Sequence, residues 1–170
     1  MKTILRTATY PFHSDVVFQC LDNLGVTGMH MTQPSMMMMG GKLDLKFLTQ
    51  SHTGPGTRYR WTGKMMGMKI DFTVEVTKWI HGREKTWETI GSARLIIYSW
   101  YQMHLSLTEH AGSTTAELSI AYKRPEGIFY RILSFLLADW YCRWCLKRML
   151  EDCGQMLTKG YNPVPGTQAV

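Results

Sequence analysis

The sequence has no long uncharged apolar run and no recognisable secretion signal. A membrane-spanning helix needs roughly 18 consecutive apolar residues. The most apolar segment of the 170-residue chain, residues 128–144, is interrupted by Arg131, Asp139 and Arg143. The opening residues MKTILRTATYPF contain neither a long apolar core nor a small-residue cleavage site. These absences lead us to expect a soluble, cytoplasmic protein.

Motifs of several common enzyme classes are also missing. Gly41 and Lys42 are not preceded by the glycine that a phosphate-binding loop needs five positions earlier. No serine lies in a GxSxG pattern, and none of the six histidines has the HExxH spacing of a zinc site. Asp71 and Glu75 alternate with apolar residues, so we expect them on the polar face of a strand. We therefore predict no metal and no cofactor.

Cysteine is scarce, and its spacing indicates packing more than chemistry. Cys142 and Cys145 form a CxxC pattern, but it lies inside a helical segment and lacks the second ligand pair of a zinc site. Redox CxxC motifs instead open a helix after a strand. Cys20 and Cys153 are isolated, and without a secretion signal we expect reduced thiols. Metal or redox chemistry at the CxxC pattern is the weaker alternative.

The basic residues give the chain a net charge of +6 but form no cluster. A charge of this size favours anionic partners only weakly. No run resembles a basic arm that binds nucleic acid, so we predict no nucleic-acid partner and a solvated basic surface. In the middle of the chain the basic residues are dispersed, at Arg58, Arg60, Lys64, Lys69, Lys78, Arg83 and Lys85.

The spacing of apolar residues predicts one strand, a helical region, a set of strands and a final helix. Val17, Leu21 and Leu24 recur at helical spacing after Ser14, a favourable N-cap, and Gly25 is expected to end this helix. Residues 26–34 are predicted to hold one more helical turn. Helical spacing returns in residues 128–157. Segments with strand character are residues 2–10, 43–47, 58–62, 68–77, 85–90, 95–107 and 116–122.

This order of elements predicts an α+β fold. The strands have one apolar face, and the final helix is the only predicted element long enough to cover it. The chain contains no internal repeat and no linker. We therefore predict a single domain in residues 1–158, with residues 159–170 as a flexible C-terminal tail.

Three stretches carry a resemblance to a known family. Residues 11–22 read PFHSDVVFQCLD, residues 54–76 read GPGTRYRWTGKMMGMKIDFTVEV, and a long helix follows Pro125-Glu-Gly127. Together they resemble the START-like (SRPBCC) superfamily, in particular its polyketide cyclase/dehydrase and lipid-transport branch. The resemblance implies a helix-grip fold, with a curved antiparallel sheet of about six to seven strands around the C-terminal helix and short helices after the first strand. It also implies a ligand cavity between sheet and helix.

The residues expected to line this cavity fall into two groups. At its mouth we place His30 and the run Met36, Met37, Met38 and Met39, because methionine suits an irregular apolar wall. Taken alone, the run also fits a soft-metal site or a membrane contact, and His30 also fits an exposed loop. A filled core is the alternative for the second group, since residue types do not separate core from cavity. That group is Tyr59, Trp61, Met68, Ile70, Phe72, Val74, Tyr101, Met103, Leu105, Leu118, Leu136, Trp140 and Trp144.

The function that these observations favour is the binding of a hydrophobic small molecule, such as a lipid, polyketide or aromatic metabolite. The protein would carry, shield or sense this partner. One alternative is an enzyme of the polyketide cyclase/dehydrase type, with a Tyr, His or Arg as proton donor in the same cavity. A second is transient membrane contact through the apolar final helix, which Arg131, Arg143, Lys147 and Arg148 border. For that helix we favour burial in the fold with a basic rim. The sequence does not determine the ligand, the turnover or the oligomeric state.

Overall fold

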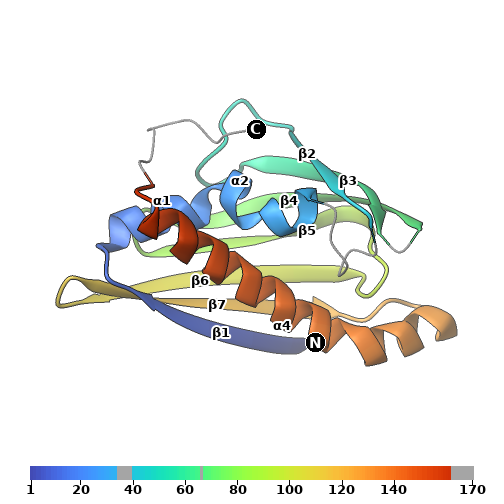
Figure 1. Cartoon of the computed structure of the whole chain (residues 1–170). Coiled ribbons are helices and arrows are strands. Elements are labelled where there is room, and N and C mark those ends of the chain that lie inside the picture. The colour runs from blue at the N-terminus through green and yellow to red at the C-terminus, as the bar shows by residue number, and fades with distance from the viewer. Residues whose placement is uncertain (34–39, 66, 162–170) are drawn as a thin grey trace.

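Seven antiparallel strands form a single curved sheet in the computed structural model, which describes residues 1–33, 40–65 and 67–161 (Figure 1). The strands lie in the order β1-β7-β6-β5-β4-β3-β2, so that β1 pairs with the last strand. The predicted α+β helix-grip fold is confirmed. The strands are β1 (Lys2–Tyr10), β2 (Leu43–Phe47), β3 (Arg58–Met65), β4 (Met68–Ile80), β5 (Glu84–Arg94), β6 (Trp100–His110) and β7 (Ser113–Lys123).

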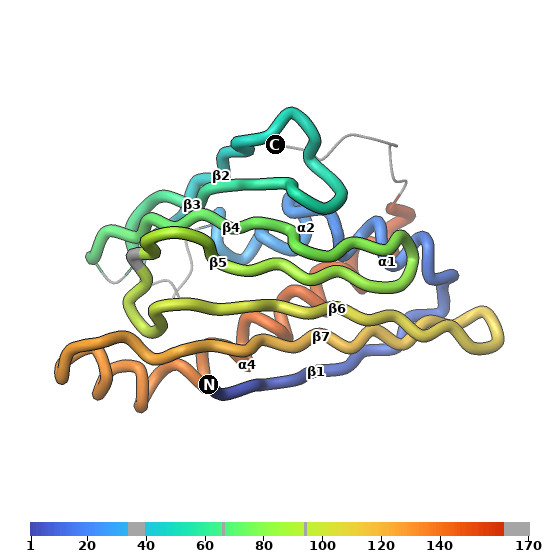
Figure 2. The backbone as a smooth tube through the Cα atoms, turned by 180° about the vertical axis from the view of Figure 1, so that it is seen from behind, coloured from blue at the N-terminus to red at the C-terminus, as the bar shows by residue number. Residues whose placement is uncertain are grey.

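The helices lie on one side of the sheet. The long α4 crosses the face of the sheet, and the three short helices lie beside it (Figure 1). Figure 2 shows the opposite face of the sheet, which these helices leave open. The core therefore lies in one layer, between the sheet and the helices. The helices are α1 (Ser14–Asp22), α2 (Leu24–Thr27), α3 (Met29–Thr32) and α4 (Ile128–Thr158).

The first helix is held at its start by a carboxylate from the sheet, and it is shorter than predicted. Glu109 of β6 accepts hydrogen bonds from the Ser14 backbone N–H at 2.8 Å and from His13 Nδ1 at 2.7 Å. The N-cap is His13, one residue before the predicted Ser14. The helix ends at Asp22, because the next residue, Asn23, is the N-cap of α2. The Asn23 Oδ1 accepts a hydrogen bond from the Gly25 N–H at 2.8 Å.

Alternation along β4 separates the core from the outer face. Ile70, Phe72 and Val74 are buried beneath the helices. On the outer face, Asp71 accepts two hydrogen bonds from the guanidinium of Arg60 at 2.6 and 2.7 Å. Exposed pairs of this kind contribute little stability, so the buried face of the strand sets its register.

The predicted long strand over residues 95–107 is wrong in its first part. β5 and β6 pair only between Glu84–Glu88 and Gln102–Ser106, and beyond Glu88 the two strands separate. Residues 95–99 form a loop across this gap instead of a strand. Ile96, Ile97 and Tyr98 are all buried in succession, a pattern that the two-residue repeat of a strand does not allow. The gap between β5 and β6 gives the fold space for a cavity.

The two ends of the described chain are attached to the fold. The N-terminal strand pairs with β7 along its whole length. Tyr161, in the predicted flexible tail, accepts a hydrogen bond from Asn23 Nδ2 at 3.1 Å, and residues 162–170 lie outside the described part. Among the described residues, no helix is long and apolar enough to cross a bilayer.

Candidate functional site

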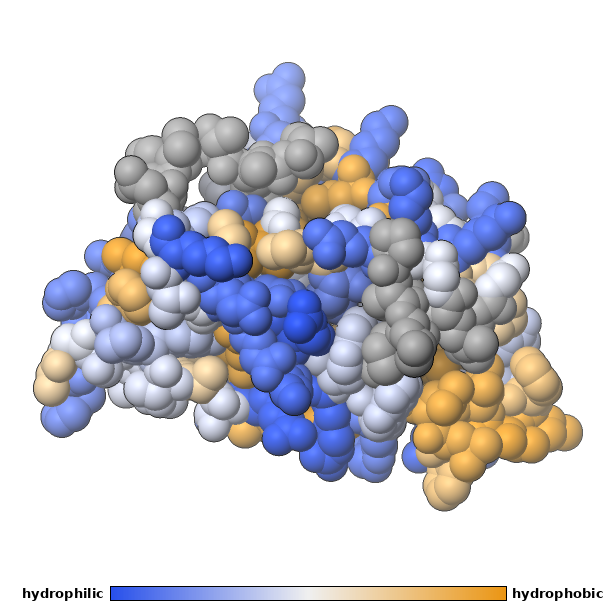
Figure 3. Space-filling model, viewed as in Figure 1, coloured by the Kyte–Doolittle hydropathy of each residue, from blue (hydrophilic) through white to orange (hydrophobic). Residues whose placement is uncertain are grey.

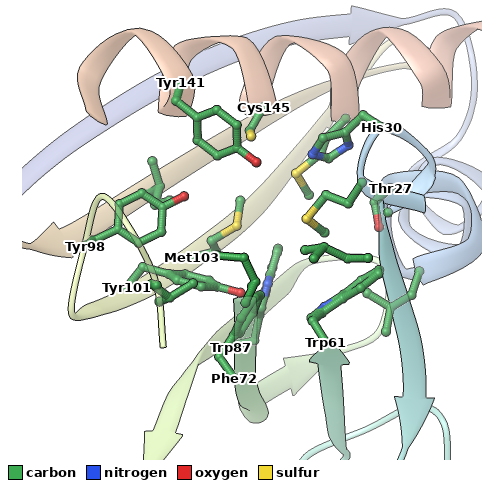
Figure 4. Close-up of a pocket in the computed structure, with 18 of the residues that line it drawn as sticks. Thr27, His30, Trp61, Phe72, Trp87, Tyr98, Tyr101, Met103, Tyr141 and Cys145 are labelled. Atoms are coloured by element: carbon green, nitrogen blue, oxygen red, sulfur yellow. The ribbon is translucent and has the colours of Figure 1, made fainter. Parts of the chain in front are cut away.

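A largely apolar cavity of about 80 Å³ lies between the sheet, the middle of α4, the short helices and the loop at residues 95–99 (Figure 4). Gly28, between α2 and α3, brings the short helices directly onto Trp61. A Cβ at this position would lie 2.7 Å from Cη2 of that ring.

The structure brings part of the predicted set together around this cavity. Met36, Met37, Met38 and Met39, predicted as the adaptable lip, lie outside the described residues. Their placement in a cavity wall therefore stays a prediction. The predicted residues that line the cavity are His30, Tyr59, Trp61, Ile70, Phe72, Tyr101 and Met103.

Other predicted residues share the inner face of the sheet but do not line the cavity. Val74, Leu105 and Leu118 are almost completely buried farther along their strands, where they pack as core. Met68 is half-buried and pairs across the β3–β4 turn with Met65, which does line the cavity. The inner face of the sheet therefore divides into a cavity wall near the gap and a filled core elsewhere.

The prediction was wrong for Leu136 and Trp140, whose side chains are 66% and 54% exposed. They lie on the outward side of α4, in its first half. Trp144, one turn farther on, is half-buried and packs edge-to-face on His30 with ring centroids 5.3 Å apart. Helical spacing identified an apolar stripe on α4 but could not show which part of it has a sheet beneath.

Several lining residues were missed by the sequence reasoning. The loop residues Leu95, Ile96 and Tyr98 belong to the segment that was predicted as a strand, and they line the cavity. Trp87 also lines it, and alternation along β5 places Lys85 on the same inward side. The two-residue spacing of Lys85 from Trp87 could have predicted that Lys85 points inward, but its charge favoured a solvated position. The interpretation of Lys85 as part of the basic surface is wrong, because it is 3% exposed.

Lys85 is buried because it meets a buried carboxylate. Its Nζ lies 2.6 Å from Oδ1 of Asp22, the last residue of the PFHSDVVFQCLD stretch. Trp79 Nε1 donates a hydrogen bond to Oδ2 of the same carboxylate at 3.1 Å. The Lys85 ammonium also lies 4.9 Å from the ring centroid of Trp87. This neutralised pair ties α1 to β5 and places a polar group at the edge of the cavity.

Three tyrosines direct their hydroxyl groups toward the cavity (Figure 4). Tyr98 comes from the loop, Tyr101 from β6 and Tyr141 from α4. Burial raises the pKa of each hydroxyl above its usual value, and nearby cysteine side chains add to the effect. The three groups are therefore neutral at physiological pH, and a neutral phenol can donate one hydrogen bond and accept others.

His30 is the second kind of polar group in the wall. It belongs to α3, is 6% exposed, and its Nδ1 has no hydrogen-bond partner among the described residues. Burial, together with the weaker effect of the positive charge of Arg148, lowers the pKa of its imidazole from 6.5 to about 4. The ring is therefore neutral near pH 7. A buried polar atom without a partner carries a desolvation cost that a bound hydrogen-bonding group would remove.

The cysteines provide apolar surface to this region. Cys145 lines the cavity and Cys142 is buried behind it, and both are free thiols. Burial raises the pKa of Cys142 to about 12 and also raises the pKa of Cys145. Neither forms a thiolate near neutral pH, which disfavours nucleophilic chemistry. Among the described residues, no group of three or more His, Cys, Asp or Glu side chains could hold a metal ion.

Solved structures show the same architecture in several other proteins. The ZhuI aromatase/cyclase from Streptomyces sp. R1128 is similar with a TM-score of 0.70 and 12% identity, over 98% of this chain and 99% of that protein. TTHA0849 from Thermus thermophilus has a TM-score of 0.70 and 14% identity, over 95% and 100% of the two chains. Norcoclaurine synthase from Thalictrum flavum has a TM-score of 0.65 and 11% identity, over 95% and 88%.

Sequence comparisons add nothing to this similarity. No protein-family model matches the chain, and no curated protein matches it in sequence. At these identities the likeness concerns the fold alone. The chain therefore has the helix-grip fold, as the resemblance to the START-like (SRPBCC) superfamily implied.

Proposed function

We propose that the chain binds a compact, largely apolar molecule that carries at least one hydrogen-bonding group. The observation that carries this proposal is Nδ1 of His30, which lies in the wall of a largely apolar cavity and has no hydrogen-bond partner among the described residues. A purely apolar ligand would leave that nitrogen without a partner. A ligand hydroxyl or carbonyl would satisfy it, depending on the tautomer of the ring.

The size of the cavity limits the ligand. Its volume of about 80 Å³ is well above the roughly 10–15 Å³ that one water needs. It is below the roughly 300–1,000 Å³ of pockets that enclose drug-sized ligands. A single ring is therefore the largest ligand class that this volume favours, and a ring needs some widening of the cavity, because an engineered apolar cavity that binds benzene measures about 150 Å³. A longer polyketide or lipid requires displacement of a wall, and the loop at residues 95–99 is a wall that lies outside the sheet ladder.

The structural neighbours support this class of ligand. ZhuI is described as an aromatase/cyclase, and norcoclaurine synthase was solved with dopamine and hydroxybenzaldehyde, which are both single-ring compounds. In norcoclaurine synthase the same fold accommodates single-ring molecules. For this chain, the aromatic side chains of Trp61, Phe72 and Trp87 offer similar surfaces for a ring.

Methionine methyl groups provide a direct test of binding. Met103 and Met149 line the cavity, whereas Met1 is exposed and Met156 packs elsewhere against the core. In protein labelled with 13C-methyl methionine, 4-ethylphenol should shift the NMR signals of the first pair and leave the second pair unchanged. If millimolar 4-ethylphenol and ethylbenzene both leave Met103 and Met149 unchanged, the cavity is not a binding site for such rings.

The role of His30 is tested by comparing the two probes. His30→Phe removes the unpaired nitrogen and keeps a ring on Trp144. It should weaken the binding of 4-ethylphenol by about ten-fold, because one hydrogen bond to a buried partner is worth about 1.4 kcal/mol. Binding of ethylbenzene, which lacks the hydroxyl, should change little. Equal effects on both probes would show that His30 acts by shape alone.

An enzyme of the polyketide cyclase/dehydrase type is the second candidate. The observation that favours it is the set of neutral phenol groups, Tyr98, Tyr101 and Tyr141, which face one cavity and can polarise a carbonyl group by hydrogen bonding. A linear poly-β-carbonyl probe that cyclises spontaneously to several ring products separates the two candidates. A cyclase should change the product ratio, and Tyr101→Phe should restore the spontaneous ratio. A binding protein should leave the ratio unchanged.

A further inference from the structure

The first half of α4, residues 128–140, forms an exposed apolar surface that the cavity does not use. Figure 3 shows this surface as a continuous hydrophobic patch at one end of the molecule. Soluble monomers rarely expose large contiguous apolar patches unless these bind something. The exposed side chains are Ile128, Phe129, Ile132, Phe135, Leu136 and Trp140, between 54% and 81% exposed.

The patch exists because the helix begins beyond the edge of the packed core. In Figures 1 and 2 the start of α4 projects past the sheet. Its first polar contact with the sheet among the described residues is made by Asp139, which binds Lys2 of β1 and the hydroxyl of Tyr122 of β7. Before that point Ser134 and Ala138 turn fully inward, and Leu133 and Leu137 pack partly against the core. The other large apolar residues of this segment face outward.

Charges next to the patch are predominantly basic. Arg131 lies beside it, and Arg143 and Lys147 follow on the same outward side of the helix, all three exposed. Asp139 is the only acidic residue in residues 128–142, and its carboxylate is already engaged by Lys2. The surface thus runs from an apolar tip through Trp140 to a basic region. The whole chain also carries a net charge of +6.

We propose that residues 128–140 dock on the surface of an anionic lipid bilayer, with the apolar tip in the headgroup and acyl boundary. Interfacial helices combine Trp, Phe and Leu on one side with Lys and Arg toward the phosphates. Tryptophan is enriched at the same boundary. Arg143 and Lys147 would lie at the level of the lipid phosphates, where each basic residue adds to the attraction.

A second copy of the chain fits this surface less well. A two-fold interface places the same patch on both partners. It would bring Arg131 and Arg143 of one copy close to the same residues of the other, without an acidic counterpart on the patch. Like charges facing each other across an interface are costly. A bilayer that contains anionic lipid has the complementary charge.

The test measures binding to phosphatidylcholine vesicles with and without phosphatidylserine. The triple variant Phe129→Ser, Phe135→Ser, Leu136→Ser should bind vesicles more than about ten-fold more weakly. Each substitution removes several carbon groups that would be buried in the bilayer. A matched control replaces exposed apolar residues elsewhere, as Leu5→Ser, Leu48→Ser and Ile80→Ser. This control should retain wild-type binding. Equal loss in the two variants would show nonspecific adhesion and overturn the proposal.

Separate measurements address the electrostatic contribution to vesicle binding and the depth to which the helix enters the bilayer. Binding should require phosphatidylserine, weaken as salt is raised, and fall several-fold in Arg131→Gln, Arg143→Gln. Brominated lipid should quench part of the tryptophan fluorescence, and Trp140→Phe should remove that part. Wild-type protein that stays entirely free of both kinds of vesicle overturns the proposal. So does a stable dimer, seen by analytical ultracentrifugation, that the Phe129, Phe135 and Leu136 triple variant dissociates.

Discussion

The two halves of α4 have similar apolar character but different surroundings. In residues 141–158, Cys142, Leu146 and Cys153 are completely buried against the sheet and the short helices. In residues 128–140, Ile128, Phe135 and Leu136 are mostly exposed. The same helix thus provides a wall of the core in one half and an open surface in the other. Apolar composition of a helix therefore predicts that its surface needs a partner, but not which partner it has.

The largest expected effect comes from one substitution made in both halves. Leu146→Ala removes a completely buried side chain and should lower the free energy of unfolding by about 2–5 kcal/mol. Leu136→Ala, with the same change in helix propensity, should alter it by less than about 0.5 kcal/mol. Urea unfolding followed by circular dichroism measures both. A similar loss in the two variants would mean that the first half is also packed.

The contact between α3 and the buried half of α4 should make stability depend on pH. Burial lowers the pKa of His30 from 6.5 to about 4, so between these values the unfolded chain binds a proton that the folded chain excludes. Stability therefore falls as the pH is lowered, by about 2 kcal/mol between pH 7 and pH 5. In urea unfolding experiments, the His30→Leu variant should not show this loss of stability between pH 7 and pH 5. An NMR titration midpoint above pH 6 for His30 would contradict the prediction.

Asp139, at the border between the two halves, should add a smaller pH dependence of stability, at lower pH than that of His30. The ammonium of Lys2 and the hydroxyl of Tyr122 lower the pKa of Asp139 below its usual value of 3.8. Its stabilising effect is therefore complete above that value and is lost as the pH falls through the folded-state pKa. Because Lys2 is largely exposed, Asp139→Asn should cost only about 1 kcal/mol at pH 7. Thermal unfolding should show a smaller effect for the exposed Asp44→Asn.

The architecture was predictable where one physical signal determined it. Alternation along residues 68–77 placed Ile70, Phe72 and Val74 on the buried face, and these positions agree with β4. Strand burial is a local property of spacing, because successive side chains point to opposite faces. Residues 95–99 departed from the prediction because the gap between β5 and β6 depends on pairing with distant strands. The spacing of apolar residues within the segment does not predict that gap.

The candidate site was predictable only in part, for a related reason. The inward position of Lys85 followed from its spacing to Trp87, yet its burial depends on Asp22, which is 63 positions earlier in the sequence and 2.6 Å away in space. The outward position of Leu136 and Trp140 depends on where the sheet ends beneath α4. Both facts concern contacts between distant segments. An apolar pattern carries no information on them.

The loop at residues 95–99 gives the fold a place where sequence change can reshape the cavity without changing the strand register. Leu95, Ile96, Ile97 and Tyr98 all line the cavity, and they lie outside the ladder that fixes the strand register. Substitutions there can alter the shape and polarity of the cavity without shifting a strand. Natural variants or a mutant library restricted to this short segment would therefore diversify ligand preference while the scaffold stays constant.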